Sequence, residues 1–152
     1  MRFLFLISIF LYSMNGVAVS LPQGCHAVAI KGDALIVEAV HAQLVYIYNH
    51  SDADLWLTHP DKEPGLSAGW TSRLQAGHWS ALKVAKGPFA LTCIESRPGH
   101  EQEVPCEGLI MACQWQTVKM SPTKGTFWAA EDLLLDELNA AVVQRGFVFG
   151  KK

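Results

Sequence analysis

Four cysteines are the residues of this chain whose type and spacing point most directly to a chemistry. Cys25, Cys93, Cys106 and Cys113 form no C-x-x-C pair, and the nearest two lie seven positions apart. Zinc sites usually take cysteines in close pairs. An even number of cysteines behind an export signal is instead typical of disulfide bonds. We therefore expect two disulfides.

Four cysteines can pair in three ways, and turn chemistry favours one of them. The segment 97–101 is turn-forming, and a hairpin that places Cys93 opposite Cys106 centres its turn between Gly99 and His100. Opposite hairpin residues lie at Cα distances of about 4.5 to 5.5 Å, which a disulfide can span. We predict the first of the following pairings and keep the second as its alternative: Cys93–Cys106 with Cys25–Cys113, or Cys93–Cys113 with Cys25–Cys106.

Six histidines invite a metal hypothesis, but their spacing does not fit one. No two of them form an H-x-H or H-x-x-x-H pair: His26, His41, His50, His59, His78 and His100. Cys106 and Met111 are separated as in some copper sites, yet no histidine lies between them. We expect loop histidines in solvent, no metal site and no cofactor.

Catalysis would need a serine beside a base, or two carboxylates that meet. His78 and Ser80 are close in sequence, but no G-x-S-x-G turn surrounds the serine. Glu95 and Glu131 would form a glycosidase-type acid pair only if the fold brought them together. We therefore assign no catalytic residue and expect the protein not to be an enzyme.

Five tryptophans fall on separate predicted strands, where large aromatic side chains usually fill the core. Two of the segments concerned, Gly69-Trp70 and His78-Trp79-Ser80, flank a loop. The alternative is that Trp70, His78 and Trp79 line a recognition surface, because exposed aromatic residues often anchor protein interfaces.

The first twenty residues have the composition of a secretory signal peptide. Arg2 precedes an apolar run over residues 3–12, which is about half as long as a membrane-spanning helix. Ala18 and Ser20 are the small residues that a signal peptidase needs for a cut before Leu21, and a cut after Ala18 is the alternative. We expect export and removal of residues 1–20.

Residues 21–152 have the length of a single domain. Because the signal removes one cation, this part holds 11 Lys and Arg against 14 Asp and Glu, and its charges are dispersed. That pattern argues against nucleic acid and anionic lipid as partners. Cys25 lacks the small-residue run that precedes a lipoprotein cysteine, so we expect no stable membrane insertion after signal cleavage.

The predicted elements are mostly short strands. Leu44 to Tyr48 alternate as a strand that can be buried on both faces, and residues 49–52 indicate a hairpin to a strand at 55–57. We expect further strands at 70–74, 79–84, 89–95 and 125–130, and either a strand or a short helix within 105–115.

One amphipathic helix is predicted at residues 133–144, with Asp132 as its N-cap and Gly146 as its stop. Its apolar stripe holds Leu134, Leu138 and Ala141, with Leu135 and Val142 beside it. Short strands followed by one late helix predict a mainly β fold: an antiparallel β-sandwich or open barrel with one C-terminal amphipathic α-helix.

Three segments resemble the enhanced-entry protein B family, which comprises small exported proteins of intracellular Gram-negative bacteria. They are A-G-W-T-S-R-L (68–74), H-W-S-A-L (78–82) and C-I-E-S-R-P-G-H-E-Q-E-V-P-C (93–106). The resemblance spans about Cys25 to Trp115. It implies a periplasmic location and a contribution to host-cell entry and virulence, and it implies no reaction and no catalytic residue.

Thr123-Lys124-Gly125 is similar to the T-K-G tripeptide of periplasmic inhibitors of C-type lysozyme, although the family's preceding tyrosine is replaced by Lys119. Lys124 thereby joins the recognition residues. We expect a non-enzymatic periplasmic or secreted binding protein that contacts a protein partner in the cell envelope. The alternative is an inhibitor of a cell-wall hydrolase, either a lysozyme or a lytic transglycosylase.

Overall fold

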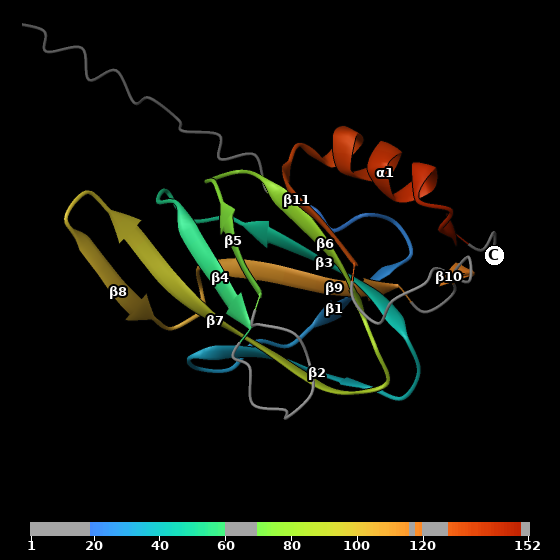
Figure 1. Ribbon diagram of the computed structural model, residues 1–152, viewed down its shortest axis with the longest axis horizontal. Coiled ribbons are helices and arrows are strands. Elements are labelled where there is room, and N and C mark those ends of the chain that lie inside the picture. Colours follow the sequence, from blue (N-terminus) through green and yellow to red (C-terminus); the bar gives the residue numbers. More distant parts are fainter. Residues whose placement is uncertain (1–18, 60–69, 116–117, 120–127, 150–152) are drawn as a thin grey trace, which may run out of the picture.

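The computed structural model describes residues 19–59, 70–115, 118–119 and 128–149. Residues 1–18 of the expected signal peptide lie outside the described residues. Two antiparallel five-stranded sheets contain most of it (Figure 1). Sheet I has the order β1-β9-β3-β6-β11, with the bounds Cys25–Val28, Ile110–Trp115, Gln43–Asn49, Trp79–Val84 and Trp128–Leu133. Sheet II has the order β2-β7-β4-β5, and β8 also pairs with β7; their bounds are Ala34–Ala39, Gly87–Arg97, Leu55–His59, Trp70–Leu74 and His100–Val104.

The two sheets pack face to face as a sandwich and not as a closed barrel, which confirms the predicted fold class and decides between its two forms. Alternating strand residues point into the space between the sheets. The core there includes Leu35, Leu57, Leu82 and Leu91, all fully buried. Apolar area removed from water at this interface supplies the main stabilisation of the fold.

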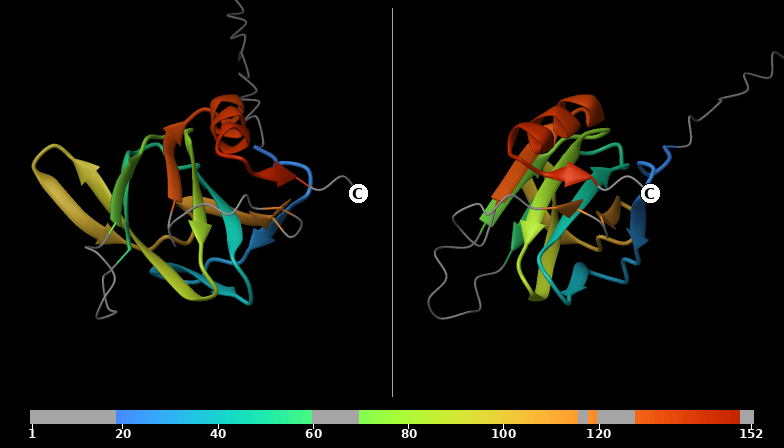
Figure 2. Two further views of the ribbon diagram at one scale, coloured as in Figure 1. Left: turned by 45° about the vertical axis from the view of Figure 1, so that its right-hand side comes forward. Right: turned by 90° about the vertical axis from the view of Figure 1, so that its right-hand side faces the viewer.

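Sheet I is also covered on its outer face, by helix α1 (Leu135–Gln144) and the segment that follows it (Figure 2). Tyr46 lies beneath the helix, where its hydroxyl donates to Asn139 Oδ1 at 3.0 Å. Burial raises the pKa of Tyr46 well above its usual value. Every residue of β3 is buried, as predicted from its unbroken apolar run. A short pair of strands, β10 (Val118–Lys119) and β12 (Val148–Phe149), completes this side.

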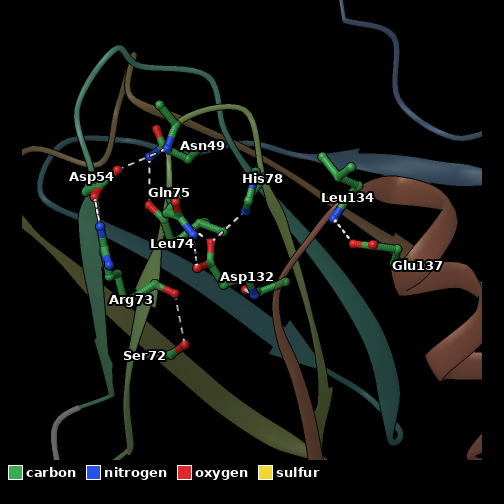
Figure 3. Close-up of polar contacts among 12 residues, drawn as sticks. Asn49, Asp54, Ser72, Arg73, Leu74, Gln75, His78, Asp132, Leu134 and Glu137 are labelled. Atoms are coloured by element: carbon green, nitrogen blue, oxygen red, sulfur yellow. Dashed lines mark hydrogen bonds and ion pairs between the residues drawn. The ribbon is translucent and has the colours of Figure 1, made fainter.

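Helix α1 starts later than predicted. Its N-cap is Leu134, whose backbone N–H donates to Glu137 Oε2 at 3.1 Å (Figure 3). The prediction of Asp132 as the cap is wrong, because β11 continues through that residue. Leu134 is exposed instead of lying on the buried stripe, which consists of Leu138 and Val142. The helix ends as predicted, since Gly146 follows the C-cap with φ +95°.

The predicted hairpin at residues 49–52 is wrong, because β3 and β4 belong to different sheets. Asn49 is fully buried, and its Nδ2 donates to the carbonyls of Ala53 and Leu74 at 2.8 and 2.9 Å. Its Oδ1 accepts from the backbone and side chain of Ser51. These bonds satisfy the backbone where the chain crosses between sheets, so turn-type residues here mark a crossover.

Both disulfides have the predicted pairing, Cys93–Cys106 and Cys25–Cys113, each with a Cα separation of 5.4 Å. The predicted hairpin register is wrong by two positions. Arg97 pairs with His100 across a two-residue turn, so Cys93 lies opposite Val104 and not Cys106. Cys106 follows β8 and returns over β7, where its sulfur lies 3.9 Å from the Leu91 carbonyl.

Residues 105–115 divide at Ile110, where β9 begins, so the apolar part of this segment is a strand and not a helix. Its register with β1 places Ala27 opposite Cys113. The Cys25–Cys113 bond therefore joins neighbouring strands diagonally. It also excludes a lipid on the Cys25 sulfur in this state, because that sulfur is already bonded.

Candidate functional site

The densest polar cluster of the described residues joins the β5–β6 turn to β11 (Figure 3). Asp132 is its centre. One carboxylate oxygen accepts from the Gln75 backbone at 2.8 Å and contacts His78 Nδ1 at 3.0 Å, and the other accepts from Gln75 Nε2 at 2.7 Å. The backbone N–H of Asp132 donates to Ser80 Oγ at 3.1 Å. The side chain and backbone of Asp132 therefore connect β11 to β6 and to the turn that follows β5.

A β-bulge in β11 explains how Asp132 reaches this turn. The register with β6 shifts between Ala130 and Leu133, and Asp132 has φ +57°. An extra residue in one strand bends it and redirects a side chain. Aspartate is one of the few residues other than glycine that tolerates the left-handed conformation. The hydrogen bonds that its carboxylate makes with Gln75 and His78 offset the cost of that backbone conformation.

The ionisation of Asp132 follows from these contacts. Burial acts to raise its pKa, but hydrogen bonds from Gln75 and His78, together with the charge of His78, act in the opposite direction. The hydrogen bonds prevail, and the pKa of Asp132 is lowered from its ordinary value. The carboxylate is therefore ionised at neutral pH and acts as an acceptor only.

Asp132, His78 and Ser80 are the residue types of a hydrolase triad, but their contacts differ from those of a triad. There the serine hydroxyl donates to the histidine, whose other nitrogen contacts the carboxylate. In this structure Ser80 is fully buried, and its oxygen accepts from the Asp132 backbone. The geometry supports a structural connection between strands at this point.

The other predicted pair of acids is not brought together in a shared site. Glu95 lies on β7 in sheet II and pairs with Arg97. Glu131 lies on β11 in sheet I, where its Oε1 accepts from Trp70 Nε1 at 2.5 Å. Each carboxylate therefore has its own partner: Glu95 is paired within sheet II, whereas Glu131 is bonded across to Trp70 of β5 in the other sheet.

The histidines are dispersed over the fold. His59 stacks on Phe89 with ring centroids 4.5 Å apart, and its Nδ1 lies 2.8 Å from the Ala90 carbonyl. His41, His50 and His100 are exposed. Within the described ranges, no three His, Cys, Asp or Glu side chains gather in a way that would hold a metal ion. The same residues contain no helix of the length and apolar character needed to cross a membrane.

The recognition surface predicted from Trp70, His78, Trp79 and Lys124 does not form as a unit. Trp79 is buried against Tyr48 with ring centroids 4.7 Å apart, so it belongs to the core beneath α1 and its assignment to a surface is wrong. Trp70 and His78 are half-buried and bonded to Glu131 and Asp132. Lys124 lies outside the described residues.

A different surface stands out, the outer face of sheet II. No described element packs against it, whereas α1 covers sheet I on the far side of the molecule (Figure 2). Trp56 pairs across strands with Ile94 and Arg73, and Ile36, 55% exposed, pairs with Ala90. We call this surface, with its neighbours Thr58, Thr71 and Thr92, the bare face.

Sequence reasoning missed the bare face because it treated the tryptophans mainly as core residues. The signal is present in the alternation of β2, where Leu35 and Val37 are buried and Ile36 and Glu38 are exposed. Alternation alone does not tell which sheet a helix covers. That information comes only from the position of α1.

The β7–β8 hairpin also borders an open hollow of about 440 Å³ lined by Glu95, Arg97, His100 and Gln102. Small-molecule pockets are usually lined mainly by apolar side chains. These four are all polar, and Glu95 and Arg97 already pair with each other. The hairpin that carries these residues extends past the sandwich, to the left in Figure 1.

Comparison of the chain with known proteins found no matching protein-family model, no matching curated protein and no matching solved structure. The resemblance to the enhanced-entry protein B family is therefore an expectation from the three sequence segments given above. The chain is accordingly defined by its structure: a two-disulfide β-sandwich in which α1 covers sheet I and no described element packs on the outer face of sheet II.

Proposed function

We propose that this protein is a non-enzymatic accessory protein of the periplasm or the cell exterior, which acts by protein–protein contact and contributes to host-cell entry. The single observation that carries the proposal is the bare face of sheet II. It combines a half-buried tryptophan, two isoleucines and flanking hydroxyl and charged side chains on one face of a sheet.

The composition of the bare face suits a protein partner. Interfaces that form and separate have an apolar centre with aromatic anchors and a polar rim. Trp56 and Ile94 are neighbours at such a centre, and Arg73 and Thr71 lie toward the β5 side. Arg73, the cross-strand partner of Trp56, is held by an ion pair with Asp54 (Figure 3).

The disulfides indicate an oxidising compartment outside the cytoplasm. We propose that this compartment is the periplasm or the cell exterior. It is supported by the signal-like N-terminal sequence and by the similarity to the enhanced-entry family.

A pull-down from envelope extract tests the proposal with a matched pair of variants. Ile36→Lys places a charge on the bare face, and Val143→Lys places one on α1, where the side chain is 58% exposed against 55% for Ile36. The proposal predicts that the wild type and the Val143 variant recover the same envelope protein and that the Ile36 variant does not. Equal recovery by both variants would contradict it.

Inhibition of a cell-wall hydrolase is the alternative proposal, and it rests on Thr123-Lys124-Gly125, which the structure does not describe. A lysozyme or lytic transglycosylase as the recovered protein, together with inhibition lost in Lys124→Ala, would favour it. Turnover of peptidoglycan or model esters by the purified domain would contradict both binding proposals.

A further inference from the structure

One edge of sheet II is made of two short strands that lie end to end. Strand β7 pairs with β4 through residues 92–95, with β2 through 87–92 and with β8 through 93–97. Because a strand has only two edges, β2 and β8 must share the edge of β7 that β4 leaves free. Together they form a composite edge that runs along the whole of the eleven-residue strand β7.

The junction of the composite edge is held in place. The backbone N–H of Gly32 donates to Glu107 Oε2 at 2.8 Å, and the backbone N–H of Glu107 donates to the Gly32 carbonyl at 3.1 Å. The Cys93–Cys106 bond lies beside this junction and fixes the base of the hairpin. The edge is therefore pre-organised, which lowers the entropy cost of binding another strand.

No described strand pairs with the outer side of the composite edge. Four of the five β8 residues are exposed, and the hairpin projects away from α1 (Figures 1 and 2). Alternate residues of such an edge present unpaired N–H and C=O groups to solvent. An extended segment of another chain can pair with these groups as an additional strand.

The side chains of the composite edge select the charge of its partner. Glu38, Glu101 and Glu103 point to the same side as the bare face, since they lie opposite Pro88, Ser96 and Ile94 of β7, which carry no charge. Strands β2 and β8 themselves contain no Lys or Arg; the cations Lys31 and Lys86 lie in the segments before β2 and β7, and Arg97 at the hairpin end pairs with Glu95. Carboxylates therefore dominate this edge.

We propose that the composite edge binds an extended cationic segment of the partner protein, with alternate Lys or Arg side chains opposite Glu101, Glu103 and Glu38. This rests on the proposed function and names the chemistry of its partner. A second copy of the chain does not fit, because edge-to-edge pairing would set glutamates of one copy against those of the other.

An NMR titration with a ten-residue peptide of alternating Lys and Thr tests the proposal. We expect the amide signals of Glu101 and Glu103 to shift and their hydrogen exchange to slow as the new strand forms. A peptide with Glu in place of Lys should not bind. A Lys–Thr peptide with every backbone N–H methylated keeps its charge but cannot pair, so it should also lose the protection.

Paired protein variants supply the control. Glu101→Gln with Glu103→Gln should weaken binding by about fivefold at low salt, since each exposed ion pair contributes little and is screened. Asp52→Asn with Asp136→Asn removes the same charge from exposed positions away from the edge and should change little. Equal weakening by both double variants would overturn the proposal.

Other outcomes are equally decisive. Undiminished binding of the methylated peptide, shifts confined to the Trp56 indole, or a peptide-free dimer through β8 would each overturn strand addition. A failed titration combined with a positive Ile36/Val143 pull-down contradicts this inference alone. Equal recovery of the partner by the Ile36→Lys and Val143→Lys variants contradicts the proposed function, whether or not the peptide binds.

Discussion

Deleting the two disulfides one at a time should destabilise the domain by clearly different amounts. The chain closed by Cys25–Cys113 is 88 residues long, and that closed by Cys93–Cys106 is 13 residues long. The chain-entropy relation gives about 4.5 kcal/mol for the long loop and about 2.9 kcal/mol for the short one. The short loop lies within the long one, so the larger value is calculated for the chain that remains free when the short loop is already closed.

Two double variants make the comparison, Cys25→Ala with Cys113→Ala and Cys93→Ala with Cys106→Ala. All four side chains are at most 9% exposed, so each pair of substitutions removes buried sulfur to a similar extent. Urea unfolding followed by tryptophan fluorescence gives the free energy of unfolding of each variant and of the wild type. The expected difference between the variants is about 1.6 kcal/mol, with the Cys25–Cys113 deletion the less stable.

An equal loss in both variants, or a larger loss for the short loop, would refute this reasoning. Either result would mean that local packing at the hairpin base outweighs the constraint on the unfolded chain. Slopes of the urea transitions serve as a control, because removal of a long cross-link exposes more surface in the unfolded state and should raise the slope.

Three further outcomes are expected. The pKa of Asp132 is lowered in the folded state, so its carboxylate stabilises the fold above the unfolded-state pKa of about 3.9, and this stabilisation is lost as pH falls through the folded-state pKa. Asp132→Asn should therefore flatten the acid side of the curve of unfolding free energy against pH, whereas Asp52→Asn should not. Identical curves for the two variants would contradict the hydrogen bonds assigned to Asp132. Leu138→Ala should cost about 2 to 5 kcal/mol because this side chain is fully buried, and calorimetry that shows no larger cost than for exposed Val143→Ala would contradict the packing of α1. Gly99→Ala should destabilise by about 1 kcal/mol because Gly99 has φ +80°; an unchanged melting temperature would mean that the turn has a different conformation.

The strand pattern was largely predictable, because alternation and apolar runs are local properties of a sequence. Phe89, Leu91 and Cys93 face the core as the alternation of β7 indicates. The unbroken apolar run of β3 likewise corresponds to a strand buried on both faces. These features need no knowledge of which strands are neighbours.

Strand neighbours were not predictable from turn residues alone. Asn49 and Ser51 have the composition of a hairpin turn, yet Asn49 bonds to Leu74 from another strand and the chain crosses to the second sheet. Asp132 has the position of a helix cap, yet Gln75 and His78 satisfy its carboxylate instead. For Asp132, long-range hydrogen bonds replace the local cap that the sequence suggests; for Asn49, a long-range bond is added to the local ones with Ser51 and Ala53.

The disulfide pairing was predicted correctly with an incorrect register. The tight turn at Pro98-Gly99 moves Cys93 opposite Val104, and Cys106 meets Cys93 only because the chain bends after β8. A disulfide tolerates a range of Cα distances, so diagonal or displaced residues can pair. The cysteine pattern therefore constrains strand registers more loosely than it constrains contacts.

Photo-crosslinking in the producing cell tests the central claim, contact with another protein through the bare face of sheet II. A photoreactive residue replaces Ile36 on the bare face or Val143 on α1, two positions of nearly equal exposure. The account predicts one discrete crosslinked protein from Ile36 and none from Val143. A product from Val143 alone, the same products from both positions, or no product from Ile36 would contradict it.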